Sequence, residues 1–362
     1  MLKIIHGADF HLDSPFSGLT PERAAQRRRE LRELPGRLAR LAREEGADLV
    51  LLSGDLLDSD RVYQETAQAL VRALGDMPCP VFLAPGNHDF WSPRSPYAAL
   101  DWPEQVHIFR SPRMEGVELP GLNCTVWGRA FLSPHQEEGP LTGFRAPEDG
   151  RIHLGCLHGD LAPQSAYGPI SQEEIAGSGL TYLALGHIHQ RTELQRTGNT
   201  FWAYPGCPEG RGFDETGEKG VLCVEAEPGA VSARLIPLCR RRYELLTVDL
   251  TGAGDPLSAI RAALPGDAGE HIFRILLTGE GERPDLAALE QVLAPLCFGV
   301  SLRDRTRLPL DLWKRRDEDT LTGLFLREMW ELCRQDPDDQ RLQLAARYGL
   351  AALENREEGA LL

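Results

Sequence analysis

The sequence predicts an α/β fold in which two sheets pack face to face with helices on their outer sides. At the start of the chain, apolar runs of strand character alternate with helical patterns, a βαβαβ order that calls for a parallel sheet covered by helices. Over residues 192–237 the pattern changes to short alternating strands broken by Gly and Pro, which implies a second sheet. At 362 residues the chain exceeds what one hydrophobic core usually serves, so two or more domains are expected.

The first part of the chain supplies most of the predicted strands. They cover residues 2–6, 49–52, 81–84, 152–157, 182–185, 200–204 and 220–226. Helices are predicted over residues 21–45 and 61–75, between the first three strands. The stretch 91–150 is rich in Pro and Gly and is expected to hold short strands and loops.

The character of the sequence changes after about residue 243. Strand patterns at 245–250, 272–277 and 299–303 enclose helical patterns at 256–264 and 284–296, which predicts a small separate α+β unit. Two amphipathic helices follow, one with Leu321, Leu324, Phe325, Met329 and Leu332 at helical spacing, the other with Leu342, Ala345, Ala346, Leu350 and Leu353. Either stripe is a domain core or a surface that docks a partner helix. The predicted domains are residues 1–240, 243–310 and 311–362.

Five short clusters of metal-seeking side chains follow predicted strands in the first half of the chain. They are Asp9-Phe10-His11, Gly54-Asp55-Leu56-Leu57-Asp58, Gly86-Asn87-His88-Asp89, His158-Gly159-Asp160 and Gly186-His187-Ile188-His189. Loops at the ends of parallel strands are where an α/β sheet builds its site. Asp, Asn and His together suit manganese, iron or zinc better than calcium. Two such ions can clamp a phosphate and activate water, so the ordered set indicates a two-metal phosphoesterase.

The spacing within the clusters suggests ligand roles. Alternation at a strand end would send Asp9 and His11 the same way, so both can hold one ion. The same reasoning pairs His187 with His189, although across a loop they can separate and serve different metals. Asp55 is the natural bridging carboxylate, because one anion between two cations offsets their repulsion.

The remaining cluster residues have other expected roles. Asn87 supplies a neutral carbonyl oxygen. Its neighbour His88 would point elsewhere and is interpreted as the proton donor or transition-state stabiliser near the leaving group. Asp58 and Asp89 are interpreted as carboxylates that fix the imidazole tautomer and the shape of the loop.

These motifs resemble those of the calcineurin-like metallophosphoesterase superfamily, over roughly residues 1–240. Three segments resemble those of SbcD-type DNA double-strand-break repair nucleases, above all their bacterial YhaO-like branch. They are the opening Gly-Ala-Asp-Phe-His-Leu-Asp-Ser-Pro-Phe, then Tyr204-Pro205-Gly206-Cys207-Pro208-Glu209-Gly210-Arg211, and finally Glu215-Thr216-Gly217-Glu218-Lys219-Gly220. The resemblance implies a four-layer αββα metallophosphoesterase sandwich with a small α+β capping domain and C-terminal helices.

The resemblance also assigns the site residues. It implies one manganese held by Asp9, His11, Asp55 and His189, and a second held by Asp55, Asn87, His158 and His187. His88 would be the catalytic histidine. Several members of the family carry a His where this chain has Asp58, which leaves the balance of exonuclease and endonuclease action open.

Expected partners follow from the same resemblance. The capping domain would help to choose the DNA, and a separate SMC-like ABC ATPase of the SbcC or YhaN type would be the protein partner; a homodimer is plausible from the family. No apolar run approaches the roughly 20 residues needed to cross a bilayer, and the start of the chain enters a strand instead of a signal sequence, so a cytoplasmic protein without membrane contact is expected.

The net charge of −15 is unusual for a protein that binds DNA. Local basic clusters at residues 27–29, 240–242 and 314–316 are candidates for phosphate contact, although the first is more often a solvated helix face. The acidity therefore suggests that DNA binding is shared with a partner.

Three classes of function remain open from the sequence. The favoured one is a manganese-dependent DNA phosphodiesterase that acts with an ATPase. The second is a phosphoesterase for small substrates, because fold does not fix substrate. The third is a binding scaffold that has lost its chemistry, which the full ligand set disfavours. Outside the five clusters, structural or surface roles are expected for His6, His107, His135, His153 and His271.

Overall fold

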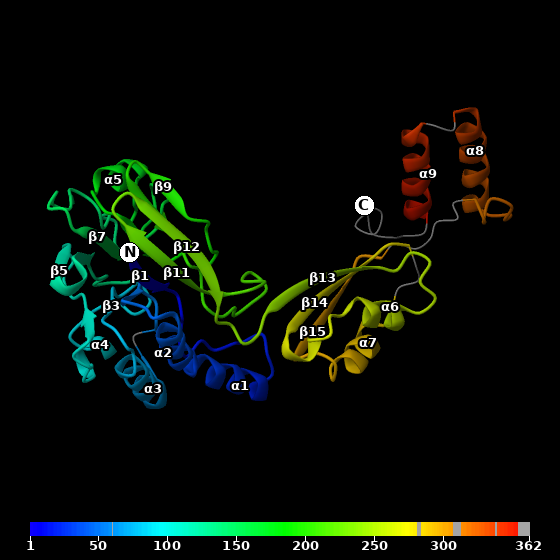
Figure 1. The fold of residues 1–362 in the computed structure, drawn as a ribbon. Coiled ribbons are helices and arrows are strands. Elements are labelled where there is room, and N and C mark those ends of the chain that lie inside the picture. Colours follow the sequence, from blue (N-terminus) through cyan, green and yellow to red (C-terminus); the bar gives the residue numbers. More distant parts are fainter. Residues whose placement is uncertain (60, 281–283, 307–312, 337–338, 354–362) are drawn as a thin grey trace. The chain divides into compact units, whose positions relative to one another are not determined.

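The computed structural model describes residues 1–362 apart from 60, 281–283, 307–312, 337–338 and 354–362. The chain divides into two compact units, Met1–Tyr243 and Glu244–Leu362. The first unit contains both large sheets, and the second contains a small sheet and the C-terminal helices (Figure 1). In the part of the chain that is described, no helix is both long and apolar enough to span a bilayer.

The first sheet of the larger unit has the strand order β12-β11-β1-β2-β3-β4. Its strands are β1 (Leu2–Gly7), β2 (Leu49–Leu52), β3 (Val81–Leu83), β4 (Val106–Ile108), β11 (Gly220–Glu227) and β12 (Ala230–Pro237). Strands β1 to β4 pair in parallel, whereas β11 joins β1 antiparallel. The parallel half therefore presents the ends of β1, β2 and β3 at one edge.

The second sheet has the order β5-β6-β7-β8-β10-β9. Its strands are β5 (Glu115–Leu119), β6 (Cys124–Gly128), β7 (Ile152–His158), β8 (Tyr182–Gly186), β9 (Gln195–Thr197) and β10 (Thr200–Ala203). The strands β6, β7, β8 and β10 run parallel to one another, with antiparallel strands at both edges.

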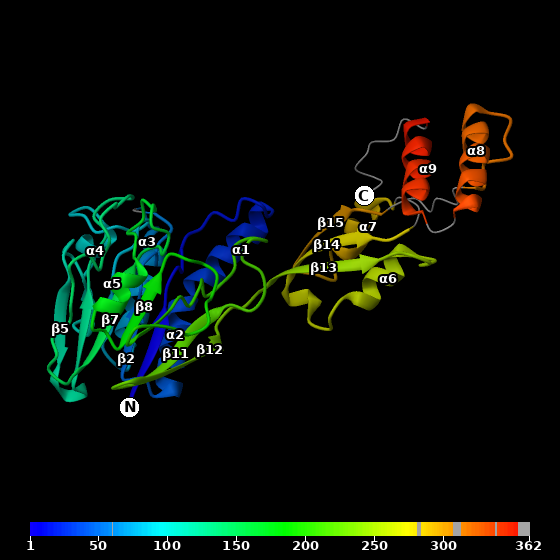
Figure 2. The same cartoon turned by 90° about the horizontal axis from the view of Figure 1, so that it is seen from above.

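The helices of this unit cover the outer faces of the two sheets (Figures 1 and 2). They are α1 (Pro21–Arg32), α2 (Leu34–Glu45), α3 (Gln64–Gly75), the short α4 (Pro96–Ala99), α5 (Gln172–Gly177) and a 3-10 turn at Pro120–Leu122. Strand β1 shows how the layers arise, because alternate side chains of a strand point to opposite faces. Ile5 packs in the core beneath α1 to α3, and its neighbour Ile4 packs in the core between the sheets. The predicted four-layer αββα sandwich is confirmed.

The structure corrects two predicted features of this unit. The helix predicted over residues 21–45 is two helices that meet at Glu33, and Pro35 lies in the first turn of α2, where its missing N–H is not needed. The segment 220–237 was expected in the second sheet, but β11 and β12 extend the first sheet. The second sheet instead begins with β5, inside the stretch 91–150 in which short strands and loops are expected.

The second unit contains a three-stranded sheet in the order β13-β14-β15. Its elements are β13 (Tyr243–Asp249), α6 (Pro256–Ala263), a 3-10 turn at Ala268–Glu270, β14 (Ile272–Thr278), α7 (Leu286–Leu293), β15 (Gly299–Asp304), α8 (Leu321–Gln335) and α9 (Gln340–Leu353). Helices α8 and α9 pack on each other through Leu326, Ala346 and Leu350. Leu324 and Leu332 of the predicted stripe are 51% and 45% exposed, so α9 covers only part of it.

A buried ion network joins α1 to two loops of the first unit. The Arg27 guanidinium is fully buried and donates to Glu30 (3.0 Å), Glu209 (2.6 Å) and the carbonyl of Gly210 (2.9 Å). Arg241 donates to Glu30 at 2.6 Å, and its backbone N–H donates to Glu209 at 3.1 Å. Two of the arginines that the sequence placed in basic surface clusters are therefore structural.

We expect Glu209→Gln to lower the free energy of unfolding by about 3 kcal/mol, because it leaves the buried Arg27 without its closest carboxylate. Urea unfolding followed by circular dichroism measures this change. Glu65→Gln is the matched control, since Glu65 pairs with Arg32 while 80% exposed and should matter by less than about 1 kcal/mol. Equal losses in the two variants would contradict the buried network as a source of stability.

Candidate metal centre

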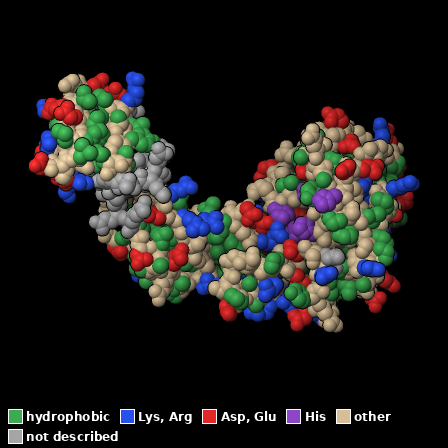
Figure 3. Space-filling model, turned by 180° about the vertical axis from the view of Figure 1, so that it is seen from behind, with side chains coloured by type: hydrophobic (Ala, Val, Ile, Leu, Met, Phe, Trp, Pro, Cys, Tyr) green, Lys and Arg blue, Asp and Glu red, His purple; other side chains and the backbone are tan. Residues whose placement is uncertain are grey.

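All five sequence clusters lie at the ends of strands or on the loops that directly follow them. The first three follow β1, β2 and β3 of the first sheet, and the last two follow β7 and β8 of the second. The loops bring their side chains together although they come from different sheets, and histidine side chains gather in one area of the first unit's surface (Figure 3). The candidate site is therefore built across the two sheets.

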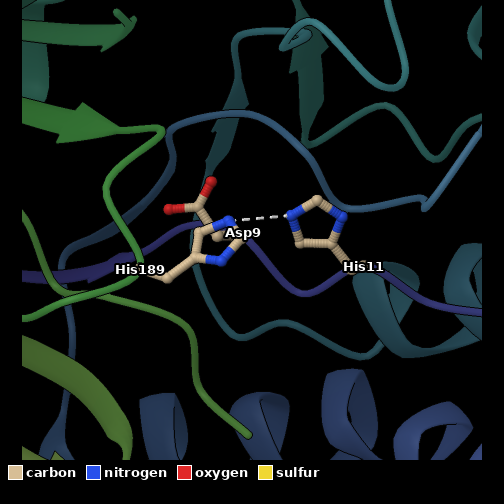
Figure 4. A group of neighbouring side chains, drawn as sticks. All are labelled: Asp9, His11 and His189. Atoms are coloured by element: carbon tan, nitrogen blue, oxygen red, sulfur yellow. Dashed lines mark hydrogen bonds between the residues drawn. The ribbon is translucent and has the colours of Figure 1, made fainter. Parts of the chain in front are cut away.

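The first group of donors consists of Asp9, His11 and His189. One ligand atom from each lies within 4.8 Å of the others. The Nε2 atoms of His11 and His189 face each other at 3.1 Å, with the Asp9 carboxylate beside them (Figure 4). Two imidazole nitrogens and a carboxylate that converge in this way form a set that suits a transition-metal ion.

The second group consists of Asn87, His158 and His187. Asn87 Oδ1 lies 2.9 Å from His158 Nε2 and 3.2 Å from His187 Nδ1. His158 also belongs to a cluster with Asp9 and Asp55 in which the ligand atoms lie within 4.8 Å. The two groups are therefore neighbours.

Asp55 lies between the two groups. Its Oδ2 is 3.8 Å from His11 Nε2 in the first group and 3.5 Å from His158 Nε2 in the second. Its Oδ1 accepts a hydrogen bond from the backbone N–H of His88 at 2.9 Å. One carboxylate thus faces a member of each group, which is the position that a bridging ligand requires.

The backbone of the site is held in unusual conformations. Asp9, His11, Asp55 and His187 all have positive φ, at 56°, 45°, 51° and 110°. Such values are costly for residues with a side chain, and they cluster at functional sites. The strand alternation expected for Asp9 and His11 does not apply, because β1 ends at Gly7. Left-handed loop residues bring these two side chains together instead.

Two glycines leave room for these side chains. A Cβ on Gly86 would lie 2.2 Å from Asp55 Oδ1, and a Cβ on Gly54 would lie 2.4 Å from His158 Nδ1. Gly54 also has φ +89°. Both positions therefore need glycine so that the backbone can approach the donor groups closely.

Hydrogen bonds on the far nitrogens orient the imidazoles. His158 Nδ1 lies 2.9 Å from the carbonyl of Ser53, which accepts its proton and leaves Nε2 with a free lone pair. His189 Nδ1 lies 2.6 Å from Glu215 Oε1. His11 Nδ1 is 3.2 Å from Asp58 Oδ1, an ion-pair distance that lacks hydrogen-bond geometry. Asp58 is thus next to an imidazole, as the sequence suggested.

Arg211 joins the two carboxylates behind these imidazoles. It donates to Glu215 Oε1 at 2.8 Å and to Asp58 Oδ1 at 3.3 Å, and its Nη2 lies 2.9 Å from His189 Nδ1. Sequence reasoning used Arg211 and Glu215 only as marks of family likeness and assigned them no role. The available signal was a basic and an acidic residue four positions apart in a Gly-rich turn soon after the last histidine motif.

His88 and Asp89 occupy different positions although they are neighbours. His88 is exposed, and its Nδ1 lies 3.1 Å from the backbone carbonyl of Asp58. Asp89 is fully buried and accepts from Tyr97 Oη (2.5 Å) and the backbone N–H groups of Gly86 (2.8 Å) and Leu57 (3.1 Å). Asp89 therefore ties two of the site loops together and does not touch an imidazole.

Comparison with known proteins shows the family to which the chain belongs. The family model of the calcineurin-like phosphoesterases matches residues 2–191, which include all five clusters. The chain belongs to the calcineurin-like phosphoesterase family. This confirms the superfamily that the sequence motifs suggested, and metal-dependent hydrolysis of phosphate esters is the chemistry of that family.

Three relatives indicate the branch of this phosphoesterase. The uncharacterized metallophosphoesterase YhaO of Bacillus subtilis is 32% identical over 268 residues, which is 70% of this chain and 64% of YhaO. The DNA double-strand break repair protein Mre11 of Saccharolobus solfataricus is 26% identical over 321 residues, 82% of this chain and 80% of the relative. Mre11 of Aeropyrum pernix is 29% identical over 284 residues, which is 73% of this chain and 68% of the relative. The match thus covers less than two thirds of YhaO.

The charges of the site fit the divalent metals that a calcineurin-like phosphoesterase uses. Burial, followed by the nearby Asp55, raises the pKa of Asp9 well above its usual value. Burial opposes ionisation of Asp55 as well, but the imidazoles of His158, His11 and His88 hold its pKa below the usual range. Burial also lowers the pKa of His11 and of His187 to about 4. Neutral imidazoles and ionised carboxylates are the donor state that a cation needs, and a bound cation would supply the positive charge that favours ionised Asp9 beside Asp55.

Proposed function

We propose that this chain is a manganese-dependent nuclease that hydrolyses phosphodiester bonds of DNA. The observation that carries the proposal is the position of Asp55, whose Oδ2 faces one histidine of each donor group. A single metal would not require a carboxylate between two sets of imidazoles. This arrangement supports the two-metal hydrolysis of phosphate esters, and the Mre11 relatives favour DNA as the ester.

The proposed ligand sets share Asp55. Asp9, His11 and His189 would complete one set, and Asn87, His158 and His187 the other. Two divalent cations bound there would supply charge neutralisation on the phosphate and activation of the attacking water. Glu215 and the Ser53 carbonyl would hold the imidazoles of His189 and His158 with Nε2 toward the cations, and Asp58 lies beside the imidazole of His11.

His88 is the proposed proton donor to the departing sugar oxygen. The carbonyl of Asp58 accepts from its Nδ1, which leaves Nε2 available to the substrate side. Its ring lies 4.7 Å from that of His11, so it stands beside the proposed metal centre while remaining exposed. Asp89 would contribute to catalysis indirectly. Its side chain accepts a hydrogen bond from the backbone N–H of Gly86 and so holds the loop that carries His88.

Partners and location are part of the same proposal. The net charge of −15, together with burial of Arg27 and Arg241, leaves DNA binding to be shared with another protein. We propose a separate SMC-like ABC ATPase of the SbcC or YhaN type, with the exposed leucines of α8 and α9 as its docking surface. A homodimer and a cytoplasmic location complete the proposal.

The test of the proposed function is hydrolysis of radiolabelled single- and double-stranded DNA, with bis(p-nitrophenyl) phosphate assayed beside it, in manganese and in chelator. We expect cleavage of DNA in manganese and no cleavage in chelator. Cleavage of the small ester alone would favour the alternative of a small-substrate phosphoesterase. No cleavage of either compound would favour a scaffold without chemistry.

We expect Glu215→Ala to weaken manganese binding by about 10- to 100-fold, because His189 loses the carboxylate that orients it. Hydrogen bonds from His189 and Arg211 outweigh burial and hold the pKa of Glu215 well below its usual range, so Glu215 is a carboxylate at neutral pH. Isothermal titration calorimetry with manganese measures the change. Glu218→Ala on the same loop is exposed and serves as the control, and an equal loss there would contradict the orienting role.

A further inference from the structure

Three aromatic rings follow one another outward from the second donor group. The ring of Tyr167 lies 5.1 Å from that of His187, and the ring of His135 lies 5.4 Å from that of Tyr167, both at an interplanar angle of 32°. These separations are those of interacting aromatic side chains. His187 and Tyr167 are partly buried, whereas His135 is exposed. A row of rings thus connects the proposed metal centre to solvent.

The loop that carries His135 is firmly held. Arg129, which is only 7% exposed, donates from Nη1 to the carbonyl of Gly139 at 3.1 Å and from Nη2 to that of Glu138 at 3.5 Å. Ser133 Oγ donates to the carbonyl of His135 at 2.5 Å. A buried arginine is therefore used to fix the shape of a surface loop, which limits the movement of the His135 backbone.

The segment that carries Tyr167 is held from two sides. The backbone N–H of Gln136 donates to the carbonyl of Ala166 at 2.7 Å, and that of Gly168 donates to the carbonyl of Gln136 at 2.7 Å. On the other side, the N–H of Asp160 donates to the carbonyl of Gly168 at 3.2 Å. Tyr167 is thus connected both to the His135 loop and to the loop that follows His158 at the end of β7.

Of these three rings, only that of His187 has a role in the hydrolysis proposed above. Stacking of a nucleobase on an aromatic side chain stabilises binding by about 1–3 kcal/mol and requires a base that is not paired. The exposed ring of His135, supported by that of Tyr167, offers a surface to the base of a flanking nucleotide.

We propose that Tyr167 and His135 form a stacking platform for an unpaired base next to the cleaved phosphate. The inference rests on the proposed nuclease function and adds to it a surface that contacts a base. The rings bind the base and take no part in bond cleavage.

The test pairs two proteins with two ligands. Wild type and Tyr167→Leu are titrated by competition fluorescence anisotropy, in chelator, with a thymidine oligonucleotide and with an oligomer of the same length made of tetrahydrofuran abasic residues. We expect wild type to prefer the thymidine oligomer by about tenfold, and Tyr167→Leu to lose this preference, because leucine keeps bulk but lacks a ring. Tyr167→Phe should retain it.

Other results would overturn the platform. A wild type that binds both oligomers equally, or a leucine variant that keeps the full preference, would each do so. If Tyr167→Leu fails to fold, His135→Ala takes its place, since this exposed side chain can be removed without loss of a core contact. Absence of DNA cleavage by the wild type in manganese would instead defeat the proposed function, and the base preference would still be measured independently.

Discussion

Replacing Asp55 with asparagine should slow phosphodiester hydrolysis by about a thousandfold or more. A factor of a thousand corresponds to about 4 kcal/mol of transition-state stabilisation. The change keeps the size of the side chain but removes the charge that lies between the two donor groups. Both proposed ligand sets therefore lose the same anion, so the loss cannot be confined to one metal.

Metal binding provides a readout that does not depend on catalysis. We expect inductively coupled plasma analysis to find about two manganese ions per wild-type chain and fewer than one in Asp55→Asn. Manganese should raise the Tm of the wild type, because a ligand of the folded state stabilises it, and should leave the Tm of the variant nearly unchanged. Asp214→Asn, at an exposed position on a neighbouring loop, is the control. Two ions retained in the Asp55 variant would contradict the bridging position.

The sequence predicted which residues form the candidate site better than it predicted how they are placed. Asp55, Asn87 and His158 could be chosen because each follows an apolar run, and strand ends in α/β proteins converge at one edge. The reason given for Asp9 and His11 was different from the actual one. Their positive φ angles depend on contacts of a folded loop, and no local sequence pattern announces them.

Features that depend on distant partners were the ones that the sequence did not predict. Strand β11 pairs with β1, which lies more than two hundred residues earlier in the chain. The sequence pattern of neither strand indicates that pairing. Arg27 looks like part of an exposed basic run until Glu209 is known to face it. A role for Arg211 and Glu215 can similarly be assigned only when the structure shows His189 and Asp58 beside them. In each case a charged or apolar side chain has two plausible environments, and tertiary structure selects one.

His88→Gln should lower kcat for DNA by about 100- to 10,000-fold while leaving manganese binding within about twofold of wild type. The backbone N–H of His88, which donates to Asp55 Oδ1, is unchanged by the substitution, so Asp55 keeps its position. The exposed ring bonds to the Asp58 carbonyl and lies 4.7 Å from the ring of His11. Steady-state kinetics and calorimetry on the same preparation separate the two effects.

The leaving group decides what His88 contributes. A sugar alkoxide is a poor leaving group that needs a proton, whereas p-nitrophenolate departs without one. If His88 donates this proton, the loss caused by His88→Gln should shrink to about tenfold or less on a p-nitrophenyl ester of thymidine 5′-phosphate. An equal loss on both substrates would show that the imidazole stabilises the phosphate or positions the substrate. In that case the proton for the departing oxygen must come from another donor, such as water.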